Sequence, residues 1–273
     1  RLGLGYRFEL QQPEFVPDFP DDDDLRAAFR RDVMAPRERN SAVFASYDVF
    51  IPKWITYRNI TSFDLPEEES VGPYAALEVA PTLEAFGSLE NFLELRTTFG
   101  ALVDLWRDGY VWAEVSGESR LRGDDWIDQG YTGLLHVATP QAFEFARIVA
   151  QTRLDTYLRD TQNRIWFAGG QTGLRGYDIG EFSGEIRWLT NVEVRSRPWK
   201  LWFLRVGGVA FYDVGDATDS FDTLNARHNV GIGLRVLIPQ SNTVPARLDW
   251  AIPIDPSRNA FPGRIAIGFG QVF

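Results

Sequence analysis

The stretch GGQTGLRGY, residues Gly169–Tyr177, combines four glycines with a single arginine, Arg175. A glycine-rich loop can cradle phosphate groups with its backbone amides, but a phosphate loop continues into Gly-Lys-Ser/Thr and then into a helix. No such tripeptide follows here, and the flanking residues alternate between apolar and polar in the manner of β-strands. The sequence therefore argues against phosphate binding. It leaves Arg175 as a cation on a long loop, either solvated or paired with an acidic group.

Other residue types that carry chemistry are absent or badly spaced. The chain has no cysteine, which excludes disulfides, thiolate chemistry and cysteine-based metal sites. Its two histidines, His136 and His228, lie far apart, and no Gly-x-Ser-x-Gly motif is present, so neither a histidine metal site nor a lipase-like centre is indicated. The acidic run Asp21–Asp24 lacks the spaced ligands of a calcium loop and is expected to be a solvated loop. We therefore predict no catalytic residue, no metal site and no cofactor.

The elements that must position these residues follow a period of two. Along residues 182–198, apolar residues alternate with charged ones, so one face of the expected strand is apolar and the other is polar. The apolar face holds Ile186, Trp188, Val192 and Val194, and the opposite face holds Glu185, Arg187, Glu193 and Arg195. About 12 segments of about 9–18 residues show this pattern, which suits tilted membrane strands better than soluble strands of about 5–6 residues.

The connections between these segments alternate in length. Short ones cover 106–109, 139–142, 197–200 and 239–242, and longer or more polar ones cover 13–40, 122–127, 158–181, 214–225 and 253–264. Short turns at one end and long loops at the other are typical of outer-membrane barrels. Segment 41–63 contains Pro52 and is either one long strand or two strands with a tight turn at Pro52-Lys53. Because alternation continues past the proline, we predict one long strand there.

The end of the chain, RIAIGFGQVF, is an alternating strand that stops on an aromatic residue. Phe269 stands in step with Phe273, as in the C-terminal signal of bacterial outer-membrane barrels. A soluble β-barrel, such as a lipocalin relative, is the alternative. It would have to explain long strands that carry charges along one whole face.

Five motifs in order make the resemblance specific. The stretch FAGGQTGLRGYDIGEFSGE is similar to the sixth extracellular loop of the Omp85 superfamily, also called the bacterial surface antigen family, whose hallmark is (V/L)RG(F/Y). TNVEVRSRP, GGVAFYDVGDA with its F-x-D-x-G pattern, ARLDWAIPI and IGFGQVF resemble the strands that follow, so the resemblance covers about residues 143–273. The hallmark residues here are Leu174, Arg175, Gly176 and Tyr177 in the loop, and Phe211, Asp213 and Gly215 in the strand.

The resemblance implies a role for the loop. In the family it folds back into the barrel, and the arginine contacts acidic side chains on the inner wall. Counting by twos places Glu193 and Asp213 on the inner faces of neighbouring strands. We therefore expect Arg175 to form charge-assisted hydrogen bonds with both carboxylates and Tyr177 to pack on the wall.

The resemblance also implies the architecture. We expect residues 1–273 to form a single all-β domain, a transmembrane antiparallel up-and-down β-barrel of about 12 strands, whereas typical members have about 16. Periplasmic POTRA domains usually precede the family's barrel, and we expect none in this chain. Loops 13–40 and 158–181 would be extracellular, and the barrel would be integral to the bacterial outer membrane.

Three functions remain open. The first is insertion, assembly or translocation of proteins through a weakly closed seam between residues 2–12 and 265–273. The second is a passive pore for ions and small solutes, and the third is a translocator or anchor for an upstream passenger. None makes the chain an enzyme. The expected partners are outer-membrane lipids, lipopolysaccharide and unfolded client proteins, and the net charge of −10 argues against nucleic acid.

Overall fold

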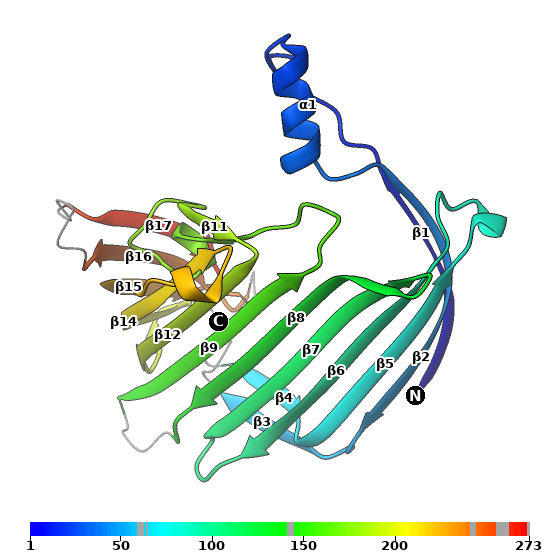
Figure 1. Cartoon of the computed structure of the whole chain (residues 1–273). Helices are drawn as coiled ribbons and strands as arrows, with labels where there is room; N and C mark the ends of the chain where they lie inside the picture. Colours follow the sequence, from blue (N-terminus) through cyan, green and yellow to red (C-terminus); the bar gives the residue numbers. More distant parts are fainter. Residues whose placement is uncertain (59–62, 64, 141–144, 241–243, 255–261, 272–273) are drawn as a thin grey trace.

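The computed structural model describes residues 1–58, 63, 65–140, 145–240, 244–254 and 262–271. Its main feature is one large antiparallel sheet in which successive strands lie side by side (Figure 1). The path of the sheet is β1 (Leu2–Gln11), β2 (Glu38–Phe50), β5 (Gly72–Thr82), β6 (Phe92–Asp104), β7 (Tyr110–Arg122), β8 (Asp125–Ala138), β9 (Ala146–Leu158), β12 (Ile186–Ser196), β14 (Leu204–Thr218), β15 (Arg227–Leu237), β16 (Ala246–Pro253) and β17 (Arg264–Phe269). This order confirms the predicted all-β, up-and-down fold and its strand number.

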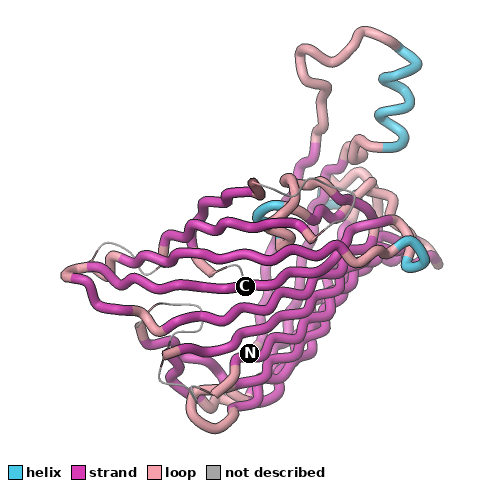
Figure 2. Tube along the Cα trace, turned by 90° about the vertical axis from the view of Figure 1, so that its left-hand side faces the viewer, coloured by secondary structure: helices cyan, strands magenta, loops and turns pink. Residues whose placement is uncertain are grey.

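The sheet is strongly curved, as two views at right angles show (Figures 1 and 2). We call its concave side the lumen. Strands β1 and β17 end the path, and within the described ranges they pair only with β2 and β16. Figure 1 draws them apart from each other.

Side chains alternate across the sheet as the sequence predicts. Apolar residues point outward and are exposed, among them Phe99 (60%), Val115 (59%) and Ile267 (68%). Charged residues such as Glu94, Asp155 and Arg235 point into the lumen and are buried. An apolar outer face around a charged interior is the inverse of a water-soluble barrel, and it is the pattern typical of outer-membrane barrels, whose apolar band faces lipid.

The two ends of the sheet differ. The connections 12–37 and 159–185 lie at one end, and the start of β1 and the end of β17 lie at the other, together with the short turns. The long-loop end carries the helix α1 (Asp23–Asp32), the 3-10 turns η1 (Glu84–Phe86), η2 (Gly170–Thr172) and η3 (Phe221–Thr223), and the two-stranded pair β10 (Trp166–Ala168) and β11 (Phe182–Gly184). Strand β13 (Trp199–Leu201) adds a short ladder to β14.

Helix α1 lies within the segment predicted as a loop over 13–40, and β2 starts earlier, at Glu38. Asp22 caps the helix: its side chain accepts hydrogen bonds from the amides of Asp24 and Leu25, both at 3.0 Å. The acidic run therefore serves helix initiation. In the described part of the chain, no helix is long and apolar enough to span a membrane.

The prediction of one strand over 41–63 was wrong. Strand β2 ends at Phe50, and β3 (Trp54–Arg58) pairs with β4 (Pro66–Ser70) in a separate two-stranded sheet. The reason is the proline: β2 is paired on both sides, and Pro52 has no amide hydrogen for either ladder. The predicted connections 122–127 and 214–225 are also too long. Strand β7 ends at Arg122 and β8 starts at Asp125, and β14 extends to Thr218.

Candidate functional site

The loop between β9 and β12 folds back into the lumen. Its base is the β10–β11 pair, and its tip contains Leu174 and Tyr177, which are 0% and 1% exposed. The amide of Gly170 donates to the carbonyls of Leu174 (2.9 Å) and Tyr177 (3.0 Å), which closes the tip into a compact turn. The loop thus presents its hallmark residues as a fixed structure.

Two glycines allow close approach of backbone and wall. A Cβ on Gly176 would lie 2.7 Å from Cβ of Asn229 on β15, so any side chain would push the loop off the wall. A Cβ on Gly215 of β14 would lie 2.3 Å from the carbonyl oxygen of Trp188 on β12. At both motif positions the neighbouring atoms lie too close for any side chain, so only glycine fits.

Arg175 lies at the centre of the site and is fully buried. Its Nε and Nη2 donate to the two carboxylate oxygens of Asp213, at 2.9 and 2.7 Å, in a bidentate pair. Its Nη1 donates to Oε1 of Glu193 at 2.6 Å. The structure therefore brings the two acidic residues singled out from the sequence to the arginine of the loop.

The carboxylates are held in turn by amides on the wall. Nδ2 of Asn191 donates to Asp213 at 2.8 Å and to the carbonyl of Gly173 at 2.6 Å, which links β12 to the loop. Nδ2 of Asn229 donates to the other oxygen of Asp213 at 2.8 Å. The amides of Asn191 and Asn229 therefore fix the orientation of the Asp213 carboxylate from the two neighbouring strands.

A wider ion cluster surrounds this centre. Asp249 on β16 has an oxygen 3.6 Å from Nη1 of Arg175, and Arg235 on β15 pairs with Asp249. Arg195 donates from Nε to Oε2 of Glu193 at 2.6 Å. Three guanidinium groups thus face three carboxylates, and a fourth buried arginine, Arg247, lies opposite Arg235 in the β15–β16 register. Pairing matters because an uncompensated charge at such depth costs several kcal/mol, of the order of 3–5 when one partner of a buried pair is lost.

Phe211 completes the cage around the guanidinium. The Cζ atom of Arg175 lies 3.4 Å from the centroid of its ring. Burial lowers the pKa of Arg175, but the hydrogen bonds and charge of Asp213, with the charges of Glu193 and Asp249, raise it above its ordinary value overall. Arg175 is therefore a permanent cation between a π-face and carboxylates.

The two other hallmark side chains anchor the loop by packing. Leu174 and Tyr177 form an apolar cluster with Leu189 on β12 and Ala217 on β14. The hydroxyl of Tyr177 also donates to the carbonyl of His228 at 3.1 Å. The loop is therefore held by an ionic centre with an apolar rim.

The C-terminal residues lie away from this cluster. Phe269 points outward from β17 and is 75% exposed, and Phe273 lies outside the described residues. The loop nonetheless reaches β17, because Nε2 of Gln171 donates to the carbonyl of Ile267 at 2.7 Å. The site thus connects the inserted loop with the last strand of the sheet.

Sequence reasoning missed several members of the cluster, chiefly Asp249, Arg235, Asn191 and Asn229. Alternation carried a signal for Asp249, since its neighbours Leu248 and Trp250 are apolar and point outward. Among the residues that the structure describes, no group of three or more His, Cys, Asp or Glu side chains is arranged to hold a metal ion. The contacts described above hold the inserted loop against the lumen wall through charged groups.

Comparison with known proteins agrees with this geometry. Residues 147–273 match the family model of the Omp85 superfamily domain. The match covers the inserted loop, the wall partners of Arg175 and every strand from β12 onward. It confirms the resemblance drawn from the sequence. No curated protein matches the chain.

Proposed function

Because residues 147–273 carry an Omp85 superfamily domain, which generally marks bacterial outer-membrane barrels that insert or translocate proteins, we propose that this chain is such an integral outer-membrane barrel. It assists insertion and assembly of client proteins or their translocation. Its partners are outer-membrane lipids, lipopolysaccharide and unfolded client proteins, and it has no enzymatic activity of its own. In this orientation, loops 13–40 and 158–181 face the outside and the end with the short turns faces the periplasm.

The observation that carries this proposal is the lock formed by Arg175, Glu193 and Asp213. Three short charge-assisted bonds at a fully buried site hold a long loop inside the lumen. In a passive pore a fixed loop would act as a constriction. In a protein that handles polypeptides, a fixed loop can also brace one part of the wall while another part opens.

The loop is placed to brace the last strand. Gln171 contacts the backbone of β17, Arg264 of β17 pairs with Asp178 of the loop, and Arg235 donates to Gln271 at 3.1 Å. The far edge of β17 has no strand partner within the described residues. A supported strand with a free edge is suited to pair with an incoming strand of a client.

A reconstitution assay tests the proposal. The purified protein would be placed in liposomes, and an unfolded outer-membrane protein would be added from outside. We expect faster membrane insertion of that client than with empty liposomes, and loss of the acceleration with Arg175→Ala. Arg96→Ala is the matched control, because Arg96 is also an ion-paired lumen arginine but pairs with Glu78 and Glu94.

Folding of each variant is checked by heat-modifiable migration in electrophoresis. If the folded wild-type protein leaves the insertion rate at the level of empty liposomes, the proposed function is wrong. If Arg175→Ala retains full acceleration, the lock has no part in it.

A further inference from the structure

A cavity of about 550 Å³ lies in the lumen at its short-turn end. Residues of the wall strands β2, β5, β6, β7, β8 and β9 line it, together with residues of β3 and β4. Four of the lining residues are aromatic side chains of the wall, namely Phe50, Tyr74, Tyr110 and Trp112. The cavity is separate from the lock, because it shares no lining residue with the cluster around Arg175.

The ring of Tyr74 forms one wall of the cavity, and a glycine makes this possible. Tyr74 lies on β5, and its ring covers Gly100 on the neighbouring strand β6, where a Cβ would clash with the ring carbon Cζ. Its hydroxyl accepts from Nε1 of Trp112 on β7 at 2.7 Å and donates to the carboxylate of Glu114. The hydrogen bonds therefore fix two aromatic rings relative to each other, with a carboxylate behind them.

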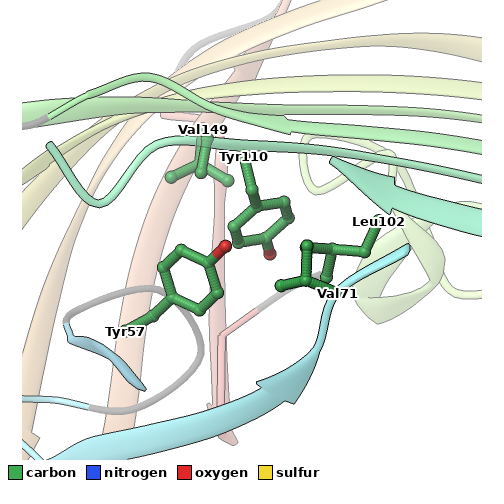
Figure 3. Close-up of a cluster of buried hydrophobic side chains, with 6 residues drawn as sticks. Tyr57, Val71, Leu102, Tyr110 and Val149 are labelled. Atoms are coloured by element: carbon green, nitrogen blue, oxygen red, sulfur yellow. The ribbon is translucent and has the colours of Figure 1, made fainter. Parts of the chain in front are cut away.

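The side of the cavity toward β6, β7 and β8 is apolar. Tyr110 and Leu102, which are 5% and 6% exposed, belong to the buried apolar cluster drawn in Figure 3. Trp112 packs against this cluster. Arg195 acts by charge on His136 of β8, so this side disfavours a positive charge. It offers an aromatic surface for the uncharged part of a ligand.

Three carboxylates surround the cavity without being neutralised. Asp48 and Glu69 line it, and Glu114 lies behind the tyrosine ring. None of the three forms a salt bridge with a described residue. Lumen carboxylates that do pair with an arginine elsewhere include Glu78, Glu94 and Asp155. The carboxylates around the cavity therefore give it a negative potential that the chain itself leaves available.

One cation of the chain already lies on an aromatic face of the cavity. The guanidinium of Arg1 stands over the ring of Phe50 on β2, with Cζ 4.8 Å from the ring centroid, and both residues line the cavity. A cation in this position is attracted by the negative face of the ring. The rings of Tyr74 and Trp112 are the same kind of surface, and they lie nearer to the carboxylate of Glu114.

We propose that this cavity binds a small organic cation with an apolar body, such as an aromatic amine. The positive head group lies against the rings of Tyr74 and Trp112 and near the carboxylate of Asp48. The apolar body packs on Tyr110. This inference goes beyond the proposed function, because it concerns a small ligand in the wall and neither client insertion nor the inserted loop.

Isothermal titration calorimetry of the full chain, in a nonionic detergent and an amine-free buffer, tests the site without any client protein, so its outcome is independent of the insertion assay. Three probes share a phenyl ring and differ in the head group: phenethylammonium is a cation, phenethyl alcohol is neutral, and phenylacetate is an anion. We expect the cation to bind at least about tenfold more tightly than the alcohol, and the anion to bind most weakly. Equal affinities for the cation and the alcohol, or no binding of the cation, would overturn the proposal.

Two variants locate the binding site on the wall. Trp112→Leu removes one aromatic face and should weaken binding of phenethylammonium at least about tenfold. Trp106→Leu is the matched control, since Trp106 is 66% exposed on the turn between β6 and β7 and should leave binding unchanged. Glu114→Gln keeps the shape of the side chain and covers the case in which Trp112→Leu fails to fold; it should weaken binding of the cation about threefold and leave that of the alcohol unchanged. Binding of the cation at wild-type strength in a natively migrating Trp112→Leu or Glu114→Gln protein would place the amine elsewhere and refute the site.

Discussion

Asp213→Asn is the most direct perturbation of the lumen lock. The wild-type carboxylate accepts from Nε and Nη2 of Arg175 at 2.9 and 2.7 Å, and both groups are fully buried. The amide is nearly isosteric but carries no charge and keeps one acceptor. Loss of one partner of a buried pair costs about 3–5 kcal/mol, and the retained acceptor places the cost near the lower limit, about 3 kcal/mol. Since each 1.4 kcal/mol is a factor of ten, the undocked loop should become about 100-fold more populated.

Trypsin provides the assay, because Arg175 is itself a cleavage site that docking hides. When opening is fast relative to cleavage, the cleavage rate follows the population of the open form. We therefore expect cleavage after Arg175, followed by mass spectrometry, to accelerate about 100-fold in Asp213→Asn. Glu94→Gln is the control, since Glu94 is a buried lumen carboxylate that pairs with Arg7 and Arg96, at 3.0 and 2.7 Å. Equal rates in wild type and Asp213→Asn, or the same acceleration in the control, would refute the lock.

Three further substitutions test the remaining contacts in the same assay. Gly176→Ala places a Cβ 2.7 Å from the β15 wall and should undock the loop by about 1–3 kcal/mol, with faster cleavage after Arg175. Tyr177→Phe removes the hydroxyl that donates to the carbonyl of His228 and keeps the ring. We expect a smaller effect of about 1 kcal/mol, and an effect as large as that of Gly176→Ala would contradict this ranking. Phe211→Leu keeps an apolar side chain but removes the π-face 3.4 Å from the guanidinium; we expect a loss of about 1–2 kcal/mol, measured as cleavage rate, and no change would mean that the ring only fills space.

The strands could be predicted because alternation is a local property. In β12, Glu193 and Val194 are adjacent and must point to opposite faces whatever the rest of the chain does. The same rule placed Asp213 on the inner face of β14. The hallmark motif then indicated which cation would meet these carboxylates.

The same locality explains the main error. Alternation continues through Pro52 because β3 and β4 form a hairpin with two faces of its own, with Tyr57 on the buried one. A pattern of period two cannot distinguish a strand that continues in the sheet from one that turns into the lumen. That choice depends on β2 being paired on both sides and on the apolar contacts that Tyr57 finds on β6, β7 and β9.

The sequence by itself determined the strand faces, the all-β class and the three residues of the lock, because each follows from local spacing or from a short motif. Only the tertiary structure decided that Asp249 and Arg235 share the site. Both point inward by alternation, but their height relative to Arg175 depends on the stagger between β14, β15 and β16. Stagger is a relation between separate strands and not a property of any one of them, and it arises when curvature and packing of the whole sheet are satisfied together.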